Sequence, residues 1–330
     1  MVKRPFRHLS PSGLSLLALG ILTLAPEAYA QPYPSGMIRI VVPSPAGTPP
    51  DIMGRIVANE LSEGEGWRVI VENKPGAIST IGLADVLKQP ADGYAVASIS
   101  LPSAAAPALL PNINFKLDAD FAPVIKLASA YHILVVNPSV PATSLSEFVA
   151  LLKSRPDKMT FSSGGFGTPA HLAGEMFKLQ TGVRATHVPY QGLARAIPDL
   201  MNGTNQFQFI TPLPVLELIA AGKLRALAVT GPARLLALKD VPTVAEAGFP
   251  DLIIQDWFGI LVKTGTPNDI VVRLNGAMNK ALAKPRVREA IEKMAAEPAG
   301  GTPAEFDRFF GSQIAHWSKV VKESGIKMHQ

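Results

Sequence analysis

The residues with the clearest chemical potential lie in one glycine-rich stretch, KMTFSSGGFGTPAHLAGEMFKLQTG, residues 158–182. Residues 159–163 have the composition of a strand, and the glycines after them can turn sharply and present their backbone amides. Thr168 and Pro169 are typical of a helix start, because threonine caps free N–H groups and proline lacks one. Unpaired N–H groups and the helix dipole predict a site for a carboxylate or phosphate. The candidate contacts here are Gly164, Gly165, Gly167 and Thr168.

The alternative is an ordinary connection between a strand and a helix, in which glycine serves only the turn. A second stretch favours a ligand, because it repeats the arrangement near the start of the chain. Residues 37–43 predict a buried strand, Ser44, Pro45, Ala46 and Gly47 a turn, and Thr48-Pro49-Pro50 a helix start. Asp51 can accept a hydrogen bond from the first turn of that helix, and this capping role competes with a catalytic one.

Other candidates follow predicted strands that would open on the same cleft. Leu101 and Ser103 belong to a turn after a strand over residues 94–100. His171 lies in the first turn of the helix that starts at Thr168. Tyr190 and its neighbour Gln191 follow a strand over residues 185–189, so they are candidates for direct contact with a ligand, with a structural role as the alternative.

Catalytic and metal motifs are missing from the sequence. It contains no G-x-S-x-G, no H-E-x-x-H, no phosphate loop ending in Gly-Lys-Ser/Thr and no EF-hand loop. The histidines share no ligand-like spacing, and the absence of cysteine excludes disulfides, thiolate metal sites and cysteine nucleophiles. We therefore predict no catalytic residue, no metal and no cofactor.

One partial match to a cofactor motif is present. Residues 165–170 satisfy G-x-G-x-x-A after a strand and at a helix start, as in dinucleotide-binding proteins. Such a site also needs an acidic residue about 20 positions further on to hold a ribose. Tyr190, Gln191 and Gly192 stand there instead, which disfavours a nicotinamide cofactor.

The elements that position these residues alternate along the chain between strand and helix, which predicts an α/β fold with parallel, doubly wound sheets. In such sheets ligands bind beyond the carboxyl ends of the strands. Strands over residues 121–128 and 132–137 follow each other without a helix, so we expect the chain to pass into a second lobe near Ala130. A strand over residues 255–262 would return it. We predict one lobe from residues 31–130 and 252–330, a second from residues 131–251, and a hinge at the two crossings.

The N-terminus predicts export. Three basic residues precede an apolar run over residues 14–24, and Ala28-Tyr29-Ala30 provides the small residues of a cleavage site. We expect residues 1–30 to be a secretory signal peptide cleaved after Ala30. The remaining 300 residues carry 28 Lys+Arg (31 minus 3) and 25 Asp+Glu (26 minus 1), a net charge of +3. That small, scattered surplus argues against nucleic acid.

A series of motifs in fixed order covers essentially the whole mature chain, and it resembles the solute-binding receptors of tripartite tricarboxylate transporters, also called Bug receptors. The motifs are IRIVVPSPAGTPPDIMGRIVANEL, VIVENKPGA, ADGYAV, DFAPV, LVVNPS, FSSGGFGTPAHLAGEMF, HVPYQG, AGKLRALAVTG, DVPTVAEAGFP and WFGILVKTGTP.

The resemblance implies a type II, two-lobed (Venus-flytrap) periplasmic binding protein that holds a small carboxylate. It also implies delivery to membrane transporter subunits or a role with a sensor protein, as a monomer and not as an enzyme. An exported enzyme that acts on a carboxylate in the same cleft is the alternative. In the family, the loops corresponding to residues 44–48 and 163–168 grip the ligand through amides, hydroxyls and water, which adds Ser163 and Phe166 to the candidates.

Two departures from the family pattern bear on the ligand. Thr48 replaces a glycine of the first loop and can supply a hydroxyl. Ile210 and Thr211 stand where the family often has an acid and an asparagine, so an ammonium group would lack that counter-charge. We therefore expect a dicarboxylate or another plain organic acid, with Thr211 among its contacts. Arg195 can meet a second carboxylate or face solvent.

Overall fold

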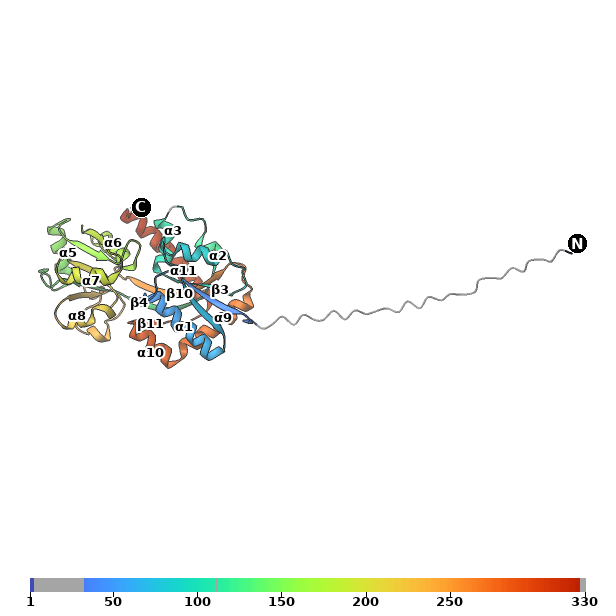
Figure 1. Ribbon diagram of the computed structural model, residues 1–330. Helices are drawn as coiled ribbons and strands as arrows, with labels where there is room; N and C mark the ends of the chain where they lie inside the picture. Colours follow the sequence, from blue (N-terminus) through green and yellow to red (C-terminus); the bar gives the residue numbers. More distant parts are fainter. Residues whose placement is uncertain (3–32, 111, 327–330) are drawn as a thin grey trace. The chain divides into compact units, whose positions relative to one another are not determined.

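The computed structural model describes residues 1–2, 33–110 and 112–326. Residues 33–326 form two β-sheets, each with helices of its own (Figure 1). We call them sheet A and sheet B. Helices α5 to α8 group around sheet B, and α1 to α3 and α9 to α11 group around sheet A.

The strands contain mostly β-branched and aliphatic residues. Their bounds are β1 Met37–Val42, β2 Arg68–Asn73, β3 Ala95–Ser100, β4 Phe121–Tyr131, β5 Ile133–Val136, β6 Thr160–Ser163, β7 Thr186–Pro189, β8 Phe207–Ile210, β9 Arg225–Val229, β10 Gln255–Lys263 and β11 Ala296–Pro298.

Several helices begin at a threonine or serine followed by proline, as the sequence predicts for Thr48 and Thr168. The α-helices are α1 Pro49–Glu65, α2 Thr80–Leu87, α3 Leu101–Leu109, α4 Leu117–Asp120, α5 Leu145–Ser154, α6 Pro169–Thr181, α7 Leu193–Met201, α8 Leu216–Ala220, α9 Asn268–Ala283, α10 Pro285–Lys293 and α11 Pro303–Ser324. Two 3₁₀ turns, η1 and η2, cover Leu213–Val215 and Leu236–Leu238.

Sheet A has the strand order β11-β4-β10-β3-β1-β2. Strand β1 pairs in parallel with β2 and β3, whereas β10 pairs antiparallel with β3 and β4. Sheet B has the order β7-β6-β8-β5-β9, with β6 parallel to β7 and β8, and β5 antiparallel to β8 and β9. Both sheets are therefore mixed, because the strands at and after each crossing between them run against their neighbours.

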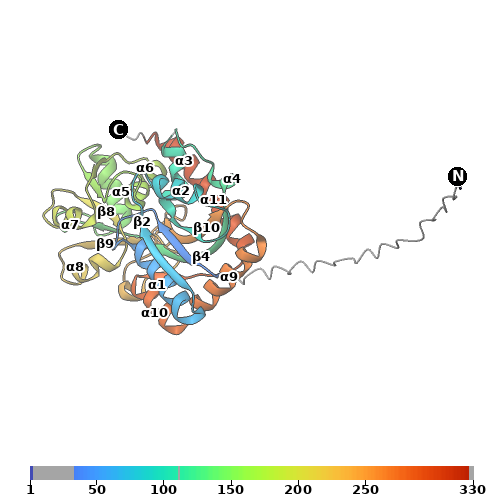
Figure 2. The same ribbon diagram turned by 45° about the vertical axis from the view of Figure 1, so that its right-hand side comes forward.

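The chain passes from sheet A to sheet B at His132, between β4 and β5, and returns along residues 230–254 before β10. Helices α1, α9 and α10 pack together over one face of sheet A, and α3 and α11 over the other (Figures 1 and 2). The α11 helix also contacts α6, which belongs to sheet B. Since β10 and α11 come from the end of the chain, sheet A is completed only by residues beyond 254.

Two elements differ from the sequence-based expectation. The turn predicted at Leu101 is the first turn of α3, in which Pro102 occupies an early position that needs no N–H group. The short edge strand β11 was not expected and ends in Pro298, a residue that edge strands tolerate. The predicted signal peptide and its cleavage site lie outside the described residues. No helix in the described residues is long and apolar enough to cross a membrane.

Candidate functional site

A cavity of about 680 Å³ lies where loops from the two sheets face each other. Its walls are the loops after β1, β2 and β3 on one side and those after β6, β7 and β8 on the other. All six strands run in parallel within their sheets, so the cavity lies at the carboxyl ends of parallel strands, where open α/β sheets bind ligands. Its volume is within the usual range for small-molecule sites, roughly 300–1,000 Å³.

The structure brings part of the predicted site together around this cavity. The predicted residues that line it are Ser44, Pro45, Thr48, Gly164, Gly165, Phe166, Gly167, Thr168 and Thr211. The predicted residues outside the lining are Ala46, Gly47, Asp51, Leu101, Ser103, Ser163, His171 and Tyr190. Three residues of this second group, Asp51, Ser163 and His171, accept hydrogen bonds from amides of the loops that form the cavity wall.

Asp51 supports the first loop from behind. Its buried carboxylate accepts hydrogen bonds from the amide of Gly47 at 2.8 Å and from Asn73 at 2.8 Å, and it pairs with Arg55 at 3.0 Å. Burial alone would raise the pKa of Asp51, but the bonds from Arg55, Gly47 and Asn73 outweigh it and hold the pKa below its ordinary value. Asp51 is therefore a structural brace of the loop; the amide that it binds belongs to Gly47, which precedes α1, so the expected bond to the first turn of the helix is not made.

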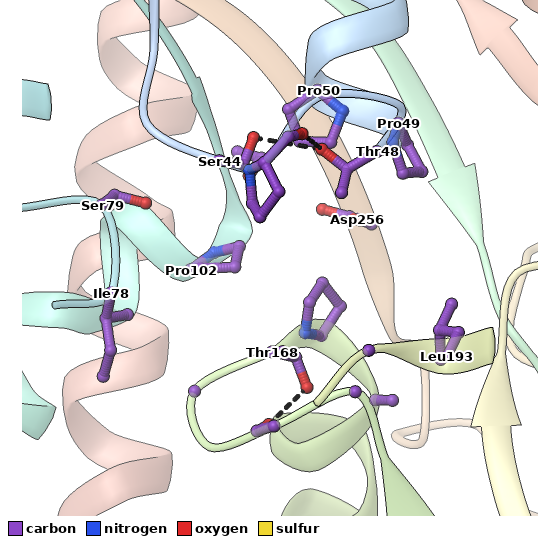
Figure 3. A pocket seen from close by; sticks show the side chains of 18 of the residues that line it. Ser44, Thr48, Pro49, Pro50, Ile78, Ser79, Pro102, Thr168, Leu193 and Asp256 are labelled. Atoms are coloured by element: carbon purple, nitrogen blue, oxygen red, sulfur yellow. Dashed lines mark hydrogen bonds between the residues drawn. The ribbon is translucent and has the colours of Figure 1, made fainter. Parts of the chain in front are cut away.

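Thr48 is also engaged within its own loop. Its hydroxyl donates to the carbonyl of Pro45 at 2.6 Å and lies 3.3 Å from the Ser44 hydroxyl (Figure 3). Prolines occupy the first two positions of α1, so this helix start lacks two of the usual N–H groups. The expectation that Thr48 supplies a free hydroxyl is wrong in this structure, and the α1 end of the cavity is poor in donors.

The glycine turn after β6 is held together by two side chains behind it. The hydroxyl of Ser163 accepts from the amide of Gly165 at 3.1 Å, and Nδ1 of His171 accepts from the amide of Gly167 at 3.1 Å. Short polar side chains compete in this way for backbone donors in turns. The expectation that both glycines present their amides to a ligand is therefore wrong, because these two N–H groups are used inside the turn.

The start of α6 remains as a donor site in the cavity wall. The hydroxyl of Thr168 donates to the carbonyl of Gly165 at 2.7 Å and makes no cap on the helix (Figure 3). Pro169 and Ala170 form the first turn and line the cavity. Without a side-chain cap, the N–H groups of this turn and the helix dipole are available to an anion in the cavity.

The loop after β2 closes the cavity from the side of sheet A. Ala77, Ile78 and Ser79 have φ values of 43°, 48° and 74°. Such a run without glycine costs of order 1–3 kcal/mol per residue and occurs mainly at functional sites. Ile78 reaches the glycine turn of the other sheet, where a Cβ atom built on Gly167 would lie 2.8 Å from Ile78 Cδ1. The two walls are therefore in contact at this point.

The predicted contact Tyr190 and the open candidate Arg195 both lie outside the cavity lining. The hydroxyl of Tyr190 donates to Asp199 of α7 at 2.6 Å and accepts from Asn205 at 2.6 Å, so it connects its strand end to α7 and to the chain after that helix. Its neighbours Gln191, Gly192 and Leu193 line the cavity instead. Arg195 is exposed, lies 3.5 Å from Gln191 and does not line the cavity.

Sequence reasoning missed the residues on the floor of the cavity. The most polar of them are Ser98, Ser100, His132 and Asp256. Burial lowers the pKa of His132 to about 4 and raises the pKa of Asp256 to about 7. His132 and Asp256 stand at the two places where the chain changes sheets. That position was the available signal, because crossings between lobes pass through the base of the cleft.

The charge of the cavity is unusual for an anion site. Among the residues that the structure describes, neither lysine nor arginine lines it, and Asp256 is its one acidic residue. Seven prolines line it as well: Pro43, Pro45, Pro49, Pro50, Pro75, Pro102 and Pro169. The geometry therefore suits a small molecule held by backbone donors and neutral side chains in a largely apolar, rigid enclosure.

The histidines behind the glycine turn predict a pH-dependent stability. His171 stacks on His187 at 4.1 Å between ring centroids. Burial, together with the nearby charge of Lys178, lowers the pKa of His171 to about 4. The unfolded chain thus binds more protons below about pH 6.5, so stability is complete above that pH and is lost as the pH falls toward 4. In this window, each unit by which the pH falls should lower the free energy of unfolding by about 1.4 kcal/mol for His171 and by a similar amount for the equally buried His132.

Urea unfolding at pH 7, 6 and 5 measures this loss. We expect His171→Gln to reduce the slope of the free energy of unfolding against pH by the contribution of one histidine, since a neutral side chain then replaces the titrating one. An unchanged slope in the variant would contradict the assignment of His171 as a neutral acceptor for Gly167.

The fold and the cavity define a class: a two-lobed α/β protein of the periplasmic binding protein type, with a cavity between the lobes. Residues 52–326 match the family described as the tripartite tricarboxylate transporter family receptor. Protein BugT of Bordetella pertussis is 35% identical over 324 residues, which cover 98% of each chain.

Solved structures agree with this assignment. A structure described as R. palustris Rpa4515 with adipate superposes with a TM-score of 0.79 at 33% identity, covering 89% of this chain and 99% of that one. MatC (Rpa3494) from Rhodopseudomonas palustris with bound malate superposes with a TM-score of 0.77 at 28% identity, covering 88% and 100%. The chain belongs to the tripartite tricarboxylate transporter receptor family, as its sequence motifs predict.

Proposed function

We propose that this protein is a periplasmic receptor that encloses a small dicarboxylate between its two lobes and presents it to a membrane transporter of the tripartite tricarboxylate type. The observation that carries the proposal is the position of the uncapped α6 start in the wall of a cavity shared by both lobes. Receptors of the same family have been solved with adipate and with malate.

The energetics are adequate without a cationic side chain. Hydrogen bonds to a charged group contribute about 1.5–3 kcal/mol each. Four such bonds, after the cost of ordering, reach the roughly 8 kcal/mol of a micromolar complex. The donors proposed for the first carboxylate are the first-turn amides of α6, reached past Thr168 and Pro169. The contact between Ile78 and Gly167 then marks where the walls meet when the lobes close.

The proposal also covers the export of the protein, the movement of its two lobes and its oligomeric state. Residues 1–30 serve as the signal peptide, with cleavage after Ala30, and the mass of the mature protein tests this. The segments 31–130 and 252–330 move as one lobe against 131–251, hinged at His132 and residues 230–254. The receptor acts as a monomer and performs no chemistry on its ligand.

Adding adipate or malate to the purified protein should raise the free energy of unfolding by about 2.7 kcal/mol at a ligand concentration of 100 Kd. For a chain of this size that corresponds to a rise in Tm of roughly 4 °C. NMR of the same mixture should show the acid unchanged after prolonged incubation. Conversion of the acid would support the exported enzyme instead. A rise in Tm with NAD⁺, but with none of the acids, would support a dinucleotide site.

A further inference from the structure

The floor of the cavity carries polar groups that the proposed grip on one carboxylate does not use. Ser98 and Ser100 come from β3, Asp256 from β10 and His132 from the link between β4 and β5, and all four line the cavity. Ser98, Ser100 and Asp256 share one face of sheet A, because Ser100 pairs with Phe258 and positions two residues apart in a strand face the same side. We call these four residues the polar floor.

Two atoms of the polar floor lack hydrogen-bond partners. The hydroxyl of Ser98 and Nδ1 of His132 are buried and unpaired within the described part of the chain. A buried polar atom without a partner costs about 1–3 kcal/mol, so a polar group that reaches either atom recovers that cost.

Asp256 lines the same cavity and is 4% exposed. Its carboxyl group accepts a hydrogen bond from the amide of Trp257 at 2.9 Å and another from the amide of Leu101 at the start of α3. Figure 3 shows Asp256 between the loop that carries Ser44 and Thr48 and the turn that carries Thr168. A ligand bound at the α6 start therefore has Asp256 on the opposite side of the cavity.

We propose that the polar floor is the subsite for the second carboxylate of the ligand, in which Asp256 is bound as a neutral acid and donates its proton to that carboxylate. Ser98 and His132 supply the remaining donors from their unpaired atoms. The inference rests on the proposed function, since it takes the ligand to be a dicarboxylate. It makes Asp256 the residue that selects for a second acidic group.

The electrostatics of the cavity support this role. Burial raises the pKa of Asp256 to about 7, and the bonds from Trp257 and Leu101 only partly oppose it, so the neutral acid is readily available near neutral pH. Neither lysine nor arginine lines the described cavity, so an ionised Asp256 and a ligand carboxylate would repel each other. One proton shared between the two groups removes this repulsion. Binding of the dianion should therefore take up one proton.

Titratable groups also lie on the elements around Asp256. They are His132 after β4, Tyr131 and Lys126 on β4, Glu297 on β11 and Asp51 on α1. Tyr131 is held by Gln255 at 3.2 Å, Lys126 lies 4.0 Å from the ring centroid of Phe309, and Asp51 is paired with Arg55. In the described part of the chain, no charged side chain contributes to the pKa of Asp256, and His132 is neutral above pH 6.5.

The test is the dissociation constant of adipate between pH 6.5 and 8.5, where adipate is fully ionised and the buried histidines stay neutral. With a pKa near 7 in the free protein, linkage predicts that adipate binds roughly 20-fold more weakly at pH 8.5 than at pH 6.5. Calorimetry in buffers of different ionisation enthalpy should show close to one proton taken up per adipate at pH 8. In Asp256→Asn the pH dependence and the proton uptake should both disappear, because the amide donates at every pH.

Matched controls separate this inference from the proposed function. Asp240→Asn removes one exposed carboxylate and should keep the pH dependence of the wild type. Hexanoate lacks the second carboxylate of adipate, so its weaker binding should be nearly independent of pH. If adipate affinity does not change with pH, or if it still changes with pH in Asp256→Asn, the proposed role of Asp256 is overturned. The proposed function would be unaffected by either result. Tighter binding of 2-aminoadipate, strengthening as the pH rises, would show that Asp256 is an ionised partner for an ammonium group. A protein that binds no carboxylate at any pH would overturn the proposed function itself.

Discussion

Gly167→Val should abolish the capture of dicarboxylates, weakening binding by at least about 100-fold, while the protein stays folded. Gly167 has a φ of +70°, which a β-branched residue adopts only under strain, and a Cβ atom there would lie 2.8 Å from Ile78 Cδ1. The added methyl groups would push the turn and Ile78 apart, displace the start of α6 and hold the lobes open. Loss of two hydrogen bonds to a carboxylate, at about 1.5–3 kcal/mol each, accounts for the expected factor. Calorimetric titration with adipate measures it.

Gly222→Val is a matched control for that experiment. Gly222 has a φ of +69°, almost the same as Gly167, but no atom lies within 4 Å of a Cβ atom built on it, and it does not line the cavity. Both variants should therefore lose similar stability in urea, whereas only Gly167→Val should lose binding. Restored binding in the double variant Gly167→Val with Ile78→Ala would identify the clash as the cause. Wild-type affinity in Gly167→Val would refute the role of this contact in capture.

The architecture could be predicted from the sequence because its signals are local. Thr48 and Thr168 are each followed by proline, which marks a helix start, and an apolar strand precedes each turn. This pattern alone predicted that both loops lie at the carboxyl ends of parallel strands. Two strands without a helix between them predicted a crossing near Ala130, and the structure has it at His132.

The elements that the sequence did not reveal depend on tertiary contacts. The sequence predicted a turn at Leu101 and Ser103 where α3 forms, but the helix is stabilised by burying Ala104 and Ala105 against the core under α11. The antiparallel course of β10 is likewise set by its neighbours β3 and β4, which lie more than a hundred residues earlier in the chain.

The site could be predicted only in outline for a similar reason. Sequence spacing located the loops, but it could not show which backbone amides of the loops are already hydrogen-bonded. The amide of Gly167, for example, donates to His171 on the helix that follows. Asp256 was missed because it is separated by 158 positions from Ser98 (256 minus 98) and by 124 from His132 (256 minus 132). One local signal existed: an acid within the apolar strand residues IIQDWFGI must be paired, hydrogen-bonded or neutral when buried.

Trp257→Ala should remove about 3–5 kcal/mol from the free energy of unfolding, a large share of the 5–15 kcal/mol typical of a folded domain. Trp257 is fully buried on β10, next to Asp256, and its ring packs edge-on against Phe306, Phe309 and Phe310 of α11. Removing the indole leaves a cavity between the returning strand and the last helix, and those two elements complete sheet A. Urea unfolding of wild type and variant measures the loss.

A pair of smaller substitutions tests why this tryptophan matters. Trp257 donates its Nε1–H to Gln313 at 3.1 Å, whereas the Nε1–H of Trp317, equally buried, has no partner in the described part of the chain. Trp257→Phe therefore loses packing and leaves Gln313 without its donor, while Trp317→Phe loses similar packing but also removes an unpaired donor. We expect Trp257→Phe to be more destabilising by about 1–2 kcal/mol, the cost of one buried hydrogen bond. Equal losses would show that packing alone fixes α11 to the strand that carries Asp256, and that the hydrogen bond to Gln313 adds nothing.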